Sequence, residues 1–227
     1  MTTGVVNKIA MIPARMGSQR LKHKNLRILG GESLIVRAVR KCREAGVFDE
    51  IWVNSENEVF GEIARREQVE FHLRPAALGD HTVTSEEYIA EFLEEHSCDL
   101  VFQVHTIAPL LPAEDVKRFV EHMEREKLDC LLSGEEIQIE CMFRGQPVNF
   151  TFSEKTNSQD LTPVQRISWG ITGWRRDTFL ANSRTGQCAT YSGRIGFFPL
   201  GRLAAHVIKT DSDLRLAESL LSVVEDR

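Results

Sequence analysis

Residues 12–25 read IPARMGSQRLKHKN and follow directly on the apolar run Ile9–Ile12. This run predicts a short buried strand, because it is apolar, ends at Pro13 and is too short for a helix. A loop at the carboxyl end of a parallel strand is where open α/β sheets bind their ligands. Residues 12–25 are therefore a candidate ligand-binding loop.

The charge of this loop indicates the kind of ligand. It contains no acidic residue and four lysines and arginines: Arg15, Arg20, Lys22 and Lys24. Gly17 and Ser18 let backbone N–H groups approach an anion closely, and the basic side chains supply charge to a polyphosphate. We predict a polyphosphate-binding loop, with a basic surface loop in contact only with solvent as the alternative. The loop matches neither G-x-x-x-x-G-K-[ST] nor G-x-G-x-x-G.

Composition limits the class of protein. The chain has 227 residues, of which 42% are hydrophobic, and a net charge of −5, which suits one α/β domain with a sizeable core. An acidic protein with one basic loop indicates local phosphate binding, so we expect no nucleic-acid partner. The sequence has no apolar run of membrane-spanning length, so we expect no membrane partner. The first residues lack the apolar core of a signal peptide and the five cysteines are widely spaced without C-x-x-C, so we expect a cytoplasmic protein with reduced thiols.

Strand and helix patterns alternate along most of the chain. Apolar residues at helical spacing, with capping residues such as Ser33 and Gly46 at the ends, predict helices over residues 33–45, 58–67, 84–95, 112–126 and 211–225. Short apolar runs predict strands over residues 51–53, 69–73, 100–104, 128–132, 171–174, 195–199 and 205–208. This alternation predicts a mostly parallel sheet covered by helices on both faces.

The alternation breaks between about Gly134 and Trp169. This segment is polar and lacks helical periodicity, although residues 146–152 alternate like an extended strand. We expect a single domain over residues 1–227, in which this segment forms a hairpin excursion, a lid or a dimerisation arm.

The loop at residues 12–25 resembles the signature I-P-A-R-x-G-S-x-R-x-x-x-K-N of the CMP-sugar synthetases, the cytidylyltransferases that activate sialic acids, related nonulosonic acids and Kdo. Residues 73–85, LRPAALGDHTVTS, resemble a second segment of that family, and weaker similarities occur at residues 105–112, 159–163 and 213–218. The resemblance implies a Rossmann-like nucleotidyltransferase fold and a homodimer to which the irregular segment contributes an arm. It also implies the reaction of CTP with a 2-keto-3-deoxy sugar acid to give a CMP-sugar and pyrophosphate.

The resemblance also implies roles for individual residues. Arg15, Arg20 and Lys24 would neutralise the triphosphate and the leaving pyrophosphate, which makes them the candidate catalytic residues. The candidate nucleotide-binding residues are Ala14, Met16, Gly17, Ser18, Asn25, Arg74 and Ser85. Gln103 and His105, at the end of the fourth strand, are candidates for substrate binding. From the residues alone, Arg74 could instead be a surface arginine, Ser85 a helix N-cap and His105 a structural histidine.

The expected cofactor is Mg²⁺, which the relatives hold with carboxylates because a hard cation prefers oxygen ligands. Kdo-type relatives carry an acid after the fourth strand, where this chain has Ile107. Sialic-type relatives carry aspartates before the last helix, where this chain has Val207 and Lys209, so that Asp211 and Asp213 are the nearby candidate ligands.

Three explanations of the missing metal-binding acids stay open. Asp211 takes the metal role after a shift in register, Lys209 replaces the cation electrostatically, or catalysis is lost and a nucleotide-binding pocket is kept. The corresponding functions are a CMP-sugar synthetase and a homologue that binds a nucleotide or CMP-sugar without turnover. A nucleotidyltransferase acting on another base or acceptor is a third possibility.

Overall fold

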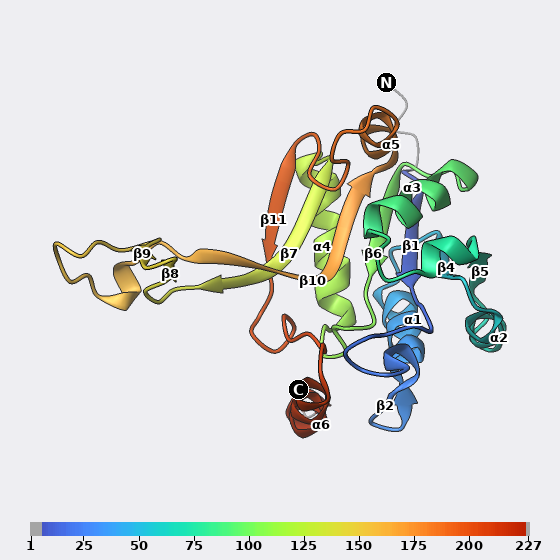
Figure 1. The fold of residues 1–227 in the computed structure, drawn as a ribbon, viewed down its shortest axis with the longest axis horizontal. Coiled ribbons are helices and arrows are strands. Elements are labelled where there is room, and N and C mark those ends of the chain that lie inside the picture. The colour runs from blue at the N-terminus through green and yellow to red at the C-terminus, as the bar shows by residue number, and fades with distance from the viewer. Residues whose placement is uncertain (1–5, 226–227) are drawn as a thin grey trace.

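Seven strands form one central sheet in the order β11-β7-β10-β6-β1-β4-β5 (Figure 1). The computed structural model describes residues 6–225. The strands of this sheet are β1 Lys8–Pro13, β4 Glu50–Ser55, β5 Glu70–Leu73, β6 Leu100–Val104, β7 Cys130–Ile137, β10 Val164–Arg175 and β11 Ile195–Pro199. Neighbouring strands run parallel except at β10, which is antiparallel to both β6 and β7. The predicted mostly parallel sheet is confirmed.

Helices cover both faces of this sheet, as predicted. The helices of the described residues are α1 Leu34–Ala45, α2 Glu58–Arg66, α3 Ser85–Glu95, α4 Ala113–Glu126, α5 Arg176–Arg184 and α6 Asp211–Glu225. On one face, α1, α2 and α4 pack against Ala10 and Ile12 of β1. On the other face, α3 and α5 pack against Ile9 and Met11. Strand β1 is apolar at every central position because both of its faces are buried.

Local sequence signals set the helix ends close to where they are predicted. The Ser33 side chain accepts a hydrogen bond from the Val36 N–H at the start of α1, and Gly46 ends that helix at φ 64°. Helix α3 begins with a capping box between Thr84 and Glu87. Thr84 is therefore the N-cap of α3, which excludes the alternative interpretation of Ser85 as the cap.

The irregular segment projects from the body as a long arm (Figure 1). The outer parts of β7 and β10 pair with each other from Val164 opposite Ile137 to Ile167 opposite Gly134, and their register shifts before Thr172. Two short strands, β8 Met142–Phe143 and β9 Gln146–Pro147, and a 3-10 helix, η3 Ser158–Asp160, lie at the end of the arm. The extended strand predicted over residues 146–152 is wrong beyond Pro147, because no neighbouring strand pairs with residues 148–152 in the described part of the chain.

The predicted strand over residues 205–208 is also wrong. These residues lie in turns and a loop, yet Ala205 and Ile208 are fully buried. Ile208 packs beneath α6, and its N–H donates to the Ile107 carbonyl at 2.8 Å. The apolar run of residues 205–208 therefore indicates that the segment is buried, and a buried loop has the same apolar pattern as a buried strand.

Two further expectations concern the ends and the thiols of the chain. None of the helices in residues 6–225 is long and apolar enough to cross a membrane. The leader-peptide expectation falls on residues 1–5, which lie outside the described residues. All five cysteines are free thiols, and Cys42 and Cys130 are buried.

Candidate functional site

A pocket of about 280 Å³ opens at the carboxyl end of β1, between the loop of residues 12–25 and the loops that follow β5 and β6. Eight of the predicted site residues line this pocket: Ala14, Arg15, Ser18, Lys24, Asn25, Arg74, Ser85 and His105. They come from segments up to about ninety positions apart in the chain. The loops meet because they follow the carboxyl ends of strands that lie close together in the sheet, which is where open α/β sheets bind ligands.

The other predicted site residues do not line the pocket: Met16, Gly17, Arg20, Gln103, Asp211 and Asp213. Met16 and Gly17 belong to the same loop, and Gln103 is fully buried behind the pocket. Pocket-lining residues that the sequence interpretation missed include Asp80, Tyr88 and Thr106.

Asn25 holds the loop in its conformation. Its side-chain N–H donates to the Arg15 carbonyl at 2.9 Å, and its Oδ1 accepts from the Thr106 hydroxyl at 2.7 Å. Asn25 and Thr106 are both buried, so these two hydrogen bonds tie the loop to the segment after β6. Arg15 makes a further link, because its guanidinium donates to the Asp80 carbonyl at 3.3 Å.

Arg74 forms the buried wall of the pocket. Its guanidinium donates to Asn54 Oδ1 at 3.0 Å, to the Ala14 carbonyl at 2.9 Å and to Glu56 Oε2 at 3.0 Å. It also lies over the Tyr88 ring, 4.7 Å from the ring centre. Arg74 is only 3% exposed, so the alternative interpretation as a surface arginine is wrong. Its buried Nε has no hydrogen-bond partner among residues 6–225.

Glu56 is a residue that sequence interpretation missed. One carboxylate oxygen pairs with Arg74, and the other accepts the Met16 N–H at 2.9 Å. One backbone N–H of the predicted anion-binding loop, that of Met16, is therefore already bonded to a carboxylate of the protein itself. The available signal was the position of Glu56 directly after β4, the strand that pairs with β1.

Several cations converge on Lys24. Burial, together with the charges of Arg20, Arg15 and Lys209, lowers the pKa of Lys24 to about 8. Lys209 lies just before α6, far from this loop in the sequence. A cluster of like charges that depresses a lysine pKa is a strong site for a polyanion, because bound phosphates relieve the repulsion.

A hydrogen-bonded chain leads from His105 into the core. His105 Nε2 donates to Gln103 Oε1 at 2.8 Å, and the Gln103 amide donates to the Tyr88 hydroxyl at 3.0 Å. Burial lowers the pKa of His105 to about 4, with a smaller contribution from the Lys24 charge. The imidazole is therefore neutral at pH 7, and its Nδ1 carries the free lone pair.

The two candidate metal ligands have other partners. Asp211 forms an ion pair with Arg27 at 3.1 Å. Asp213 Oδ2 accepts from the backbone N–H groups of Lys209 and Thr210 at 2.9 and 2.8 Å, and from the Thr210 hydroxyl. Burial alone raises the pKa of Asp213, but these hydrogen bonds outweigh it and lower the pKa. With one oxygen of Asp213 occupied and neither carboxylate lining the pocket, this pair does not fit a Mg²⁺ ion bound to pocket phosphates.

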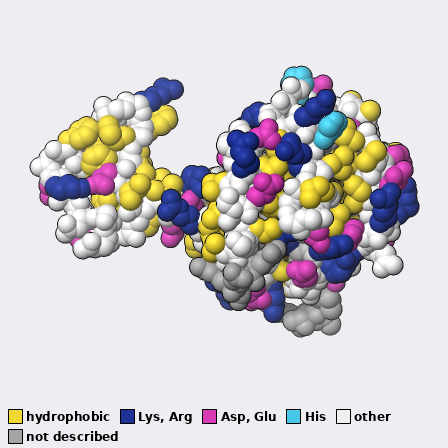
Figure 2. All heavy atoms as spheres, turned by 90° about the horizontal axis from the view of Figure 1, so that it is seen from below, with side chains coloured by type: hydrophobic (Ala, Val, Ile, Leu, Met, Phe, Trp, Pro, Cys, Tyr) yellow, Lys and Arg dark blue, Asp and Glu magenta, His cyan; other side chains and the backbone are white. Residues whose placement is uncertain are grey.

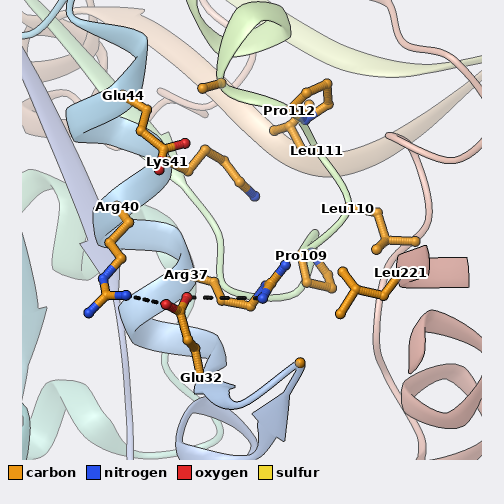
Figure 3. A pocket seen from close by; sticks show the side chains of 12 residues that line it. Glu32, Arg37, Arg40, Lys41, Glu44, Pro109, Leu110, Leu111, Pro112 and Leu221 are labelled. Atoms are coloured by element: carbon orange, nitrogen blue, oxygen red, sulfur yellow. Dashed lines mark hydrogen bonds and ion pairs between the residues drawn. The ribbon is translucent and has the colours of Figure 1, made fainter. Parts of the chain in front are cut away.

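A second cavity of about 370 Å³ lies between α1 and the segment Pro109–Ala113 (Figure 3). Lys41 from α1 is buried, and its ammonium donates to the Ala108 carbonyl at 2.6 Å. Burial lowers the pKa of Lys41 to about 8. Lys41 thus supports the segment that follows His105, and none of the predicted site residues lines this second cavity.

Solved structures with the same fold bear out the predicted architecture. A CMP:2-keto-3-deoxy-manno-octonic acid synthetase complexed with CTP matches with a TM-score of 0.72 at 16% identity, over 95% of this chain and 98% of the other. A 4-diphosphocytidyl-2C-methyl-D-erythritol synthase from Anaerococcus prevotii matches with a TM-score of 0.69 at 12% identity, over 96% and 99%. The predicted Rossmann-like nucleotidyltransferase fold is confirmed.

Sequence relatives agree with this fold. An N-acylneuraminate cytidylyltransferase from Streptococcus agalactiae serotype III (strain NEM316) is 24% identical over 194 residues, which are 81% of this chain and 47% of the relative. A 3-deoxy-manno-octulosonate cytidylyltransferase from Chelativorans sp. (strain BNC1) is 31% identical over 139 residues, 60% of this chain and 53% of the relative. The chain spans about half the length of the curated relatives it matches. A family model described as cytidylyltransferase matches residues 9–220, and the chain belongs to that family.

Proposed function

We propose that this protein transfers CMP from CTP to a sugar acid of the 2-keto-3-deoxy type, the class that includes sialic acids and Kdo, and releases pyrophosphate. The observation that carries the proposal is the convergence of Arg15, Lys24 and Arg74 on one pocket at the carboxyl end of β1. The named activities of the sequence relatives support the same substrates.

In the proposed reaction, the anomeric hydroxyl oxygen of the sugar bonds to the α-phosphorus of CTP. The bond from that phosphorus to the bridging oxygen of the β-phosphate breaks, pyrophosphate leaves, and the hydroxyl proton is released to solvent. Negative charge builds up on the leaving pyrophosphate, so fixed cations stabilise the transition state more than the ground state. Arg15, Arg20 and Lys24 are the groups assigned to this role.

Lys209 is the residue we favour for the charge that carboxylate-bound Mg²⁺ supplies in the relatives. Lys209 does not line the pocket either, but its charge reaches Lys24 and lowers that pKa, whereas Asp211 and Asp213 are engaged elsewhere. An ammonium beside a phosphate supplies part of the charge of a metal ion. No step proposed for this chain passes through a protein-bound metal, and Mg²⁺ is expected as the counter-ion that CTP carries.

His105 is assigned to ligand binding rather than to proton abstraction. An imidazole with a pKa of about 4 is a weak base at pH 7, but its neutral Nδ1 accepts a hydrogen bond from a ligand hydroxyl or amino group. Gln103 holds the opposite nitrogen and is a positioning residue.

The proposed assembly is a cytoplasmic homodimer. The arm carries apolar side chains that are more than half exposed in the single chain, over the projecting lobe in Figure 2: Ile139, Met142, Phe143, Val148 and Phe152. Apolar patches of this kind mark protein–protein contacts. A second copy that covers the arm would remove these side chains from water.

The test is pyrophosphate release from each of the four nucleoside triphosphates, with a panel of 2-keto-3-deoxy sugar acids that includes N-acetylneuraminate and Kdo. We expect turnover with CTP and at least one acid, strongly reduced in Lys24→Met and unchanged in Lys127→Met, an exposed lysine at the end of α4 that does not line the pocket. Preference for another triphosphate would contradict the proposal.

The occupied carboxylate of Asp213 favours one alternative, a homologue that binds a nucleotide without turnover. CTP affinity that is unchanged by EDTA, together with no product from any acid, would establish that alternative instead.

A further inference from the structure

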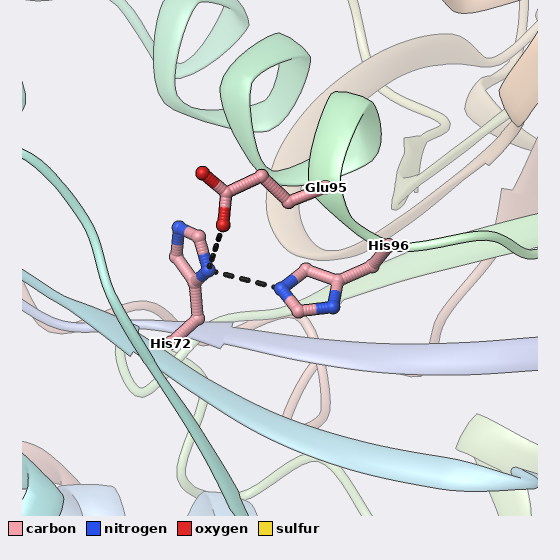
Figure 4. A group of neighbouring side chains, drawn as sticks. All are labelled: His72, Glu95 and His96. Atoms are coloured by element: carbon pink, nitrogen blue, oxygen red, sulfur yellow. Dashed lines mark hydrogen bonds and ion pairs between the residues drawn. The ribbon is translucent and has the colours of Figure 1, made fainter.

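A cluster of two histidines and a glutamate lies outside the pocket, between β5 and the end of α3 (Figure 4). His72 is on β5, Glu95 is the last residue of α3, and His96 follows that helix directly. One side-chain nitrogen or oxygen from each residue lies within 4.8 Å of the other two. The proposed transfer reaction uses none of these residues.

The distances between the ligand atoms are close to those of a metal centre. His72 Nδ1 lies 2.9 Å from His96 Nε2 and 3.8 Å from Glu95 Oε2. Two nitrogen ligands at about 2.05 Å from a tetrahedral zinc ion lie about 3.3 Å apart. The two distances from His72 Nδ1 are thus each within about half an ångström of this value, and rotation of the exposed Glu95 side chain can bring its carboxylate to the same ion.

The surroundings of His72 match those of a metal-binding histidine. Its other nitrogen, Nε2, lies 2.9 Å from Glu91 Oε2, and His72 is only 5% exposed. A carboxylate can only accept, so Nε2 donates and the lone pair of Nδ1 faces the cluster. A carboxylate behind a ligating histidine fixes the ring and raises its basicity in many metal sites.

The second histidine ring is also held in place. His96 lies against Trp52 at 4.1 Å and Phe92 at 4.4 Å between ring centres. Without an ion, His96 Nε2–H donates to His72 Nδ1; an ion would bind the Nε2 lone pair of the other neutral tautomer, in which His96 carries its proton on Nδ1. Glu95 is 64% exposed and leaves the solvent side of the cluster open.

We propose that His72, Glu95 and His96 bind a divalent ion of the zinc class, with water in the remaining coordination position. Two imidazoles and one carboxylate suit Zn²⁺ and the neighbouring transition metals, whereas Mg²⁺ and Ca²⁺ require sites built from oxygen ligands. The ion clamps β5 to α3. These elements position Arg74, which comes two residues after His72, and Tyr88, which lies on α3, so the clamp braces the back wall of the pocket.

The experiment is a titration of the tag-free, chelator-stripped full chain with Zn²⁺, followed by calorimetry, and with Co²⁺, followed by its visible absorption. We expect one saturable equivalent and a higher melting temperature with Zn²⁺. We expect His96→Gln and Glu95→Gln to lose at least about tenfold in affinity, and Glu91→Gln to lose about 10–100-fold. His122→Gln, a histidine of α4 outside the cluster, is the matched control and is expected to bind like the unaltered chain.

Because Glu95 is exposed, Glu95→Gln is expected to fold normally. The conclusion does not depend on His72→Gln, which changes a buried residue. Wild-type affinity in either His96→Gln or Glu95→Gln would overturn the three-residue site, as would the lack of a saturable Zn²⁺ equivalent in the unaltered chain. The readouts do not involve CTP, so failure of this proposal is distinguishable from failure of the proposed transferase activity.

Discussion

Arg74 and Glu56 form a buried ion pair, with 3.0 Å between Nη2 and Oε2, and the second oxygen of Glu56 holds the Met16 N–H of the anion-binding loop. The pair therefore joins the back wall of the pocket to its charged loop. Because the Arg74 side chain is buried and that of Glu56 is only 15% exposed, removing one partner costs more than it would in an ion pair on the surface.

Glu56→Gln is expected to lower the free energy of unfolding by about 3 kcal/mol, because it leaves the Arg74 charge buried without its counter-ion. Urea unfolding measures the change. Glu58→Gln is the matched control, since Glu58 pairs with Arg65 on the surface and its loss is expected to cost less than about 0.5 kcal/mol. Equal effects of the two substitutions would contradict the structural role of the pair.

Binding of CTP is expected to take up a proton at Lys24. In the protein without CTP, Lys24 has a pKa of about 8. Bound phosphates raise that pKa, so the affinity for CTP decreases as the pH rises above about 8. Calorimetry in buffers of different ionisation enthalpy measures the proton uptake. In Lys24→Arg the guanidinium stays charged, so the decrease should be much smaller. A flat affinity profile from pH 7 to pH 9 in the unaltered protein would rule out this coupling.

Asn25 and Thr106 are expected to act as one unit in holding the loop. Asn25→Ala and Thr106→Val each weaken CTP binding, and the double variant is little worse than Asn25→Ala alone, because that change already breaks the hydrogen bond to Thr106. A double-mutant cycle on CTP affinity should give a coupling of about 1 kcal/mol. Additive losses would indicate that the two side chains act separately.

Lys209→Met is expected to lower turnover by tenfold or more, on the order of 1.4 kcal/mol in the barrier, if its ammonium stabilises the leaving pyrophosphate. Arg215→Met, an exposed arginine of α6, controls for the loss of a nearby charge. The competing assignment of Asp211 to Mg²⁺ predicts the opposite pattern, in which Asp211→Asn abolishes turnover and Lys209→Met has little effect.

Lys41 is expected to make stability depend on pH. Its folded pKa of about 8 lies below the ordinary 10.5, so above pH 8 the unfolded chain holds a proton that the folded chain has lost. The contribution of Lys41 to stability therefore rises with pH between about 8 and 10.5. Relative to Lys41→Met, the protein should gain about 1 kcal/mol between pH 8 and pH 9 in urea unfolding. Parallel profiles of the two proteins would contradict the low pKa.

Local patterns predicted most of the secondary structure. Strand β1 follows from an apolar run that ends at Pro13, and α1 follows from helical spacing between Ser33 and Gly46. These signals lie within about a dozen residues, so they need no knowledge of the fold. The strand predicted over residues 205–208 failed because an apolar run shows that residues are buried but not that they pair.

The sequence by itself determined the fold class, the charged loop of residues 12–25 and its similarity to the cytidylyltransferase family, since all three rest on patterns along neighbouring residues. Only the tertiary structure decided that Glu56 pairs with Arg74, that Lys209 joins the charge around Lys24, and that His72 meets His96. The order of strands in the sheet brings these side chains together, and contacts between distant segments leave no periodic signal in the chain.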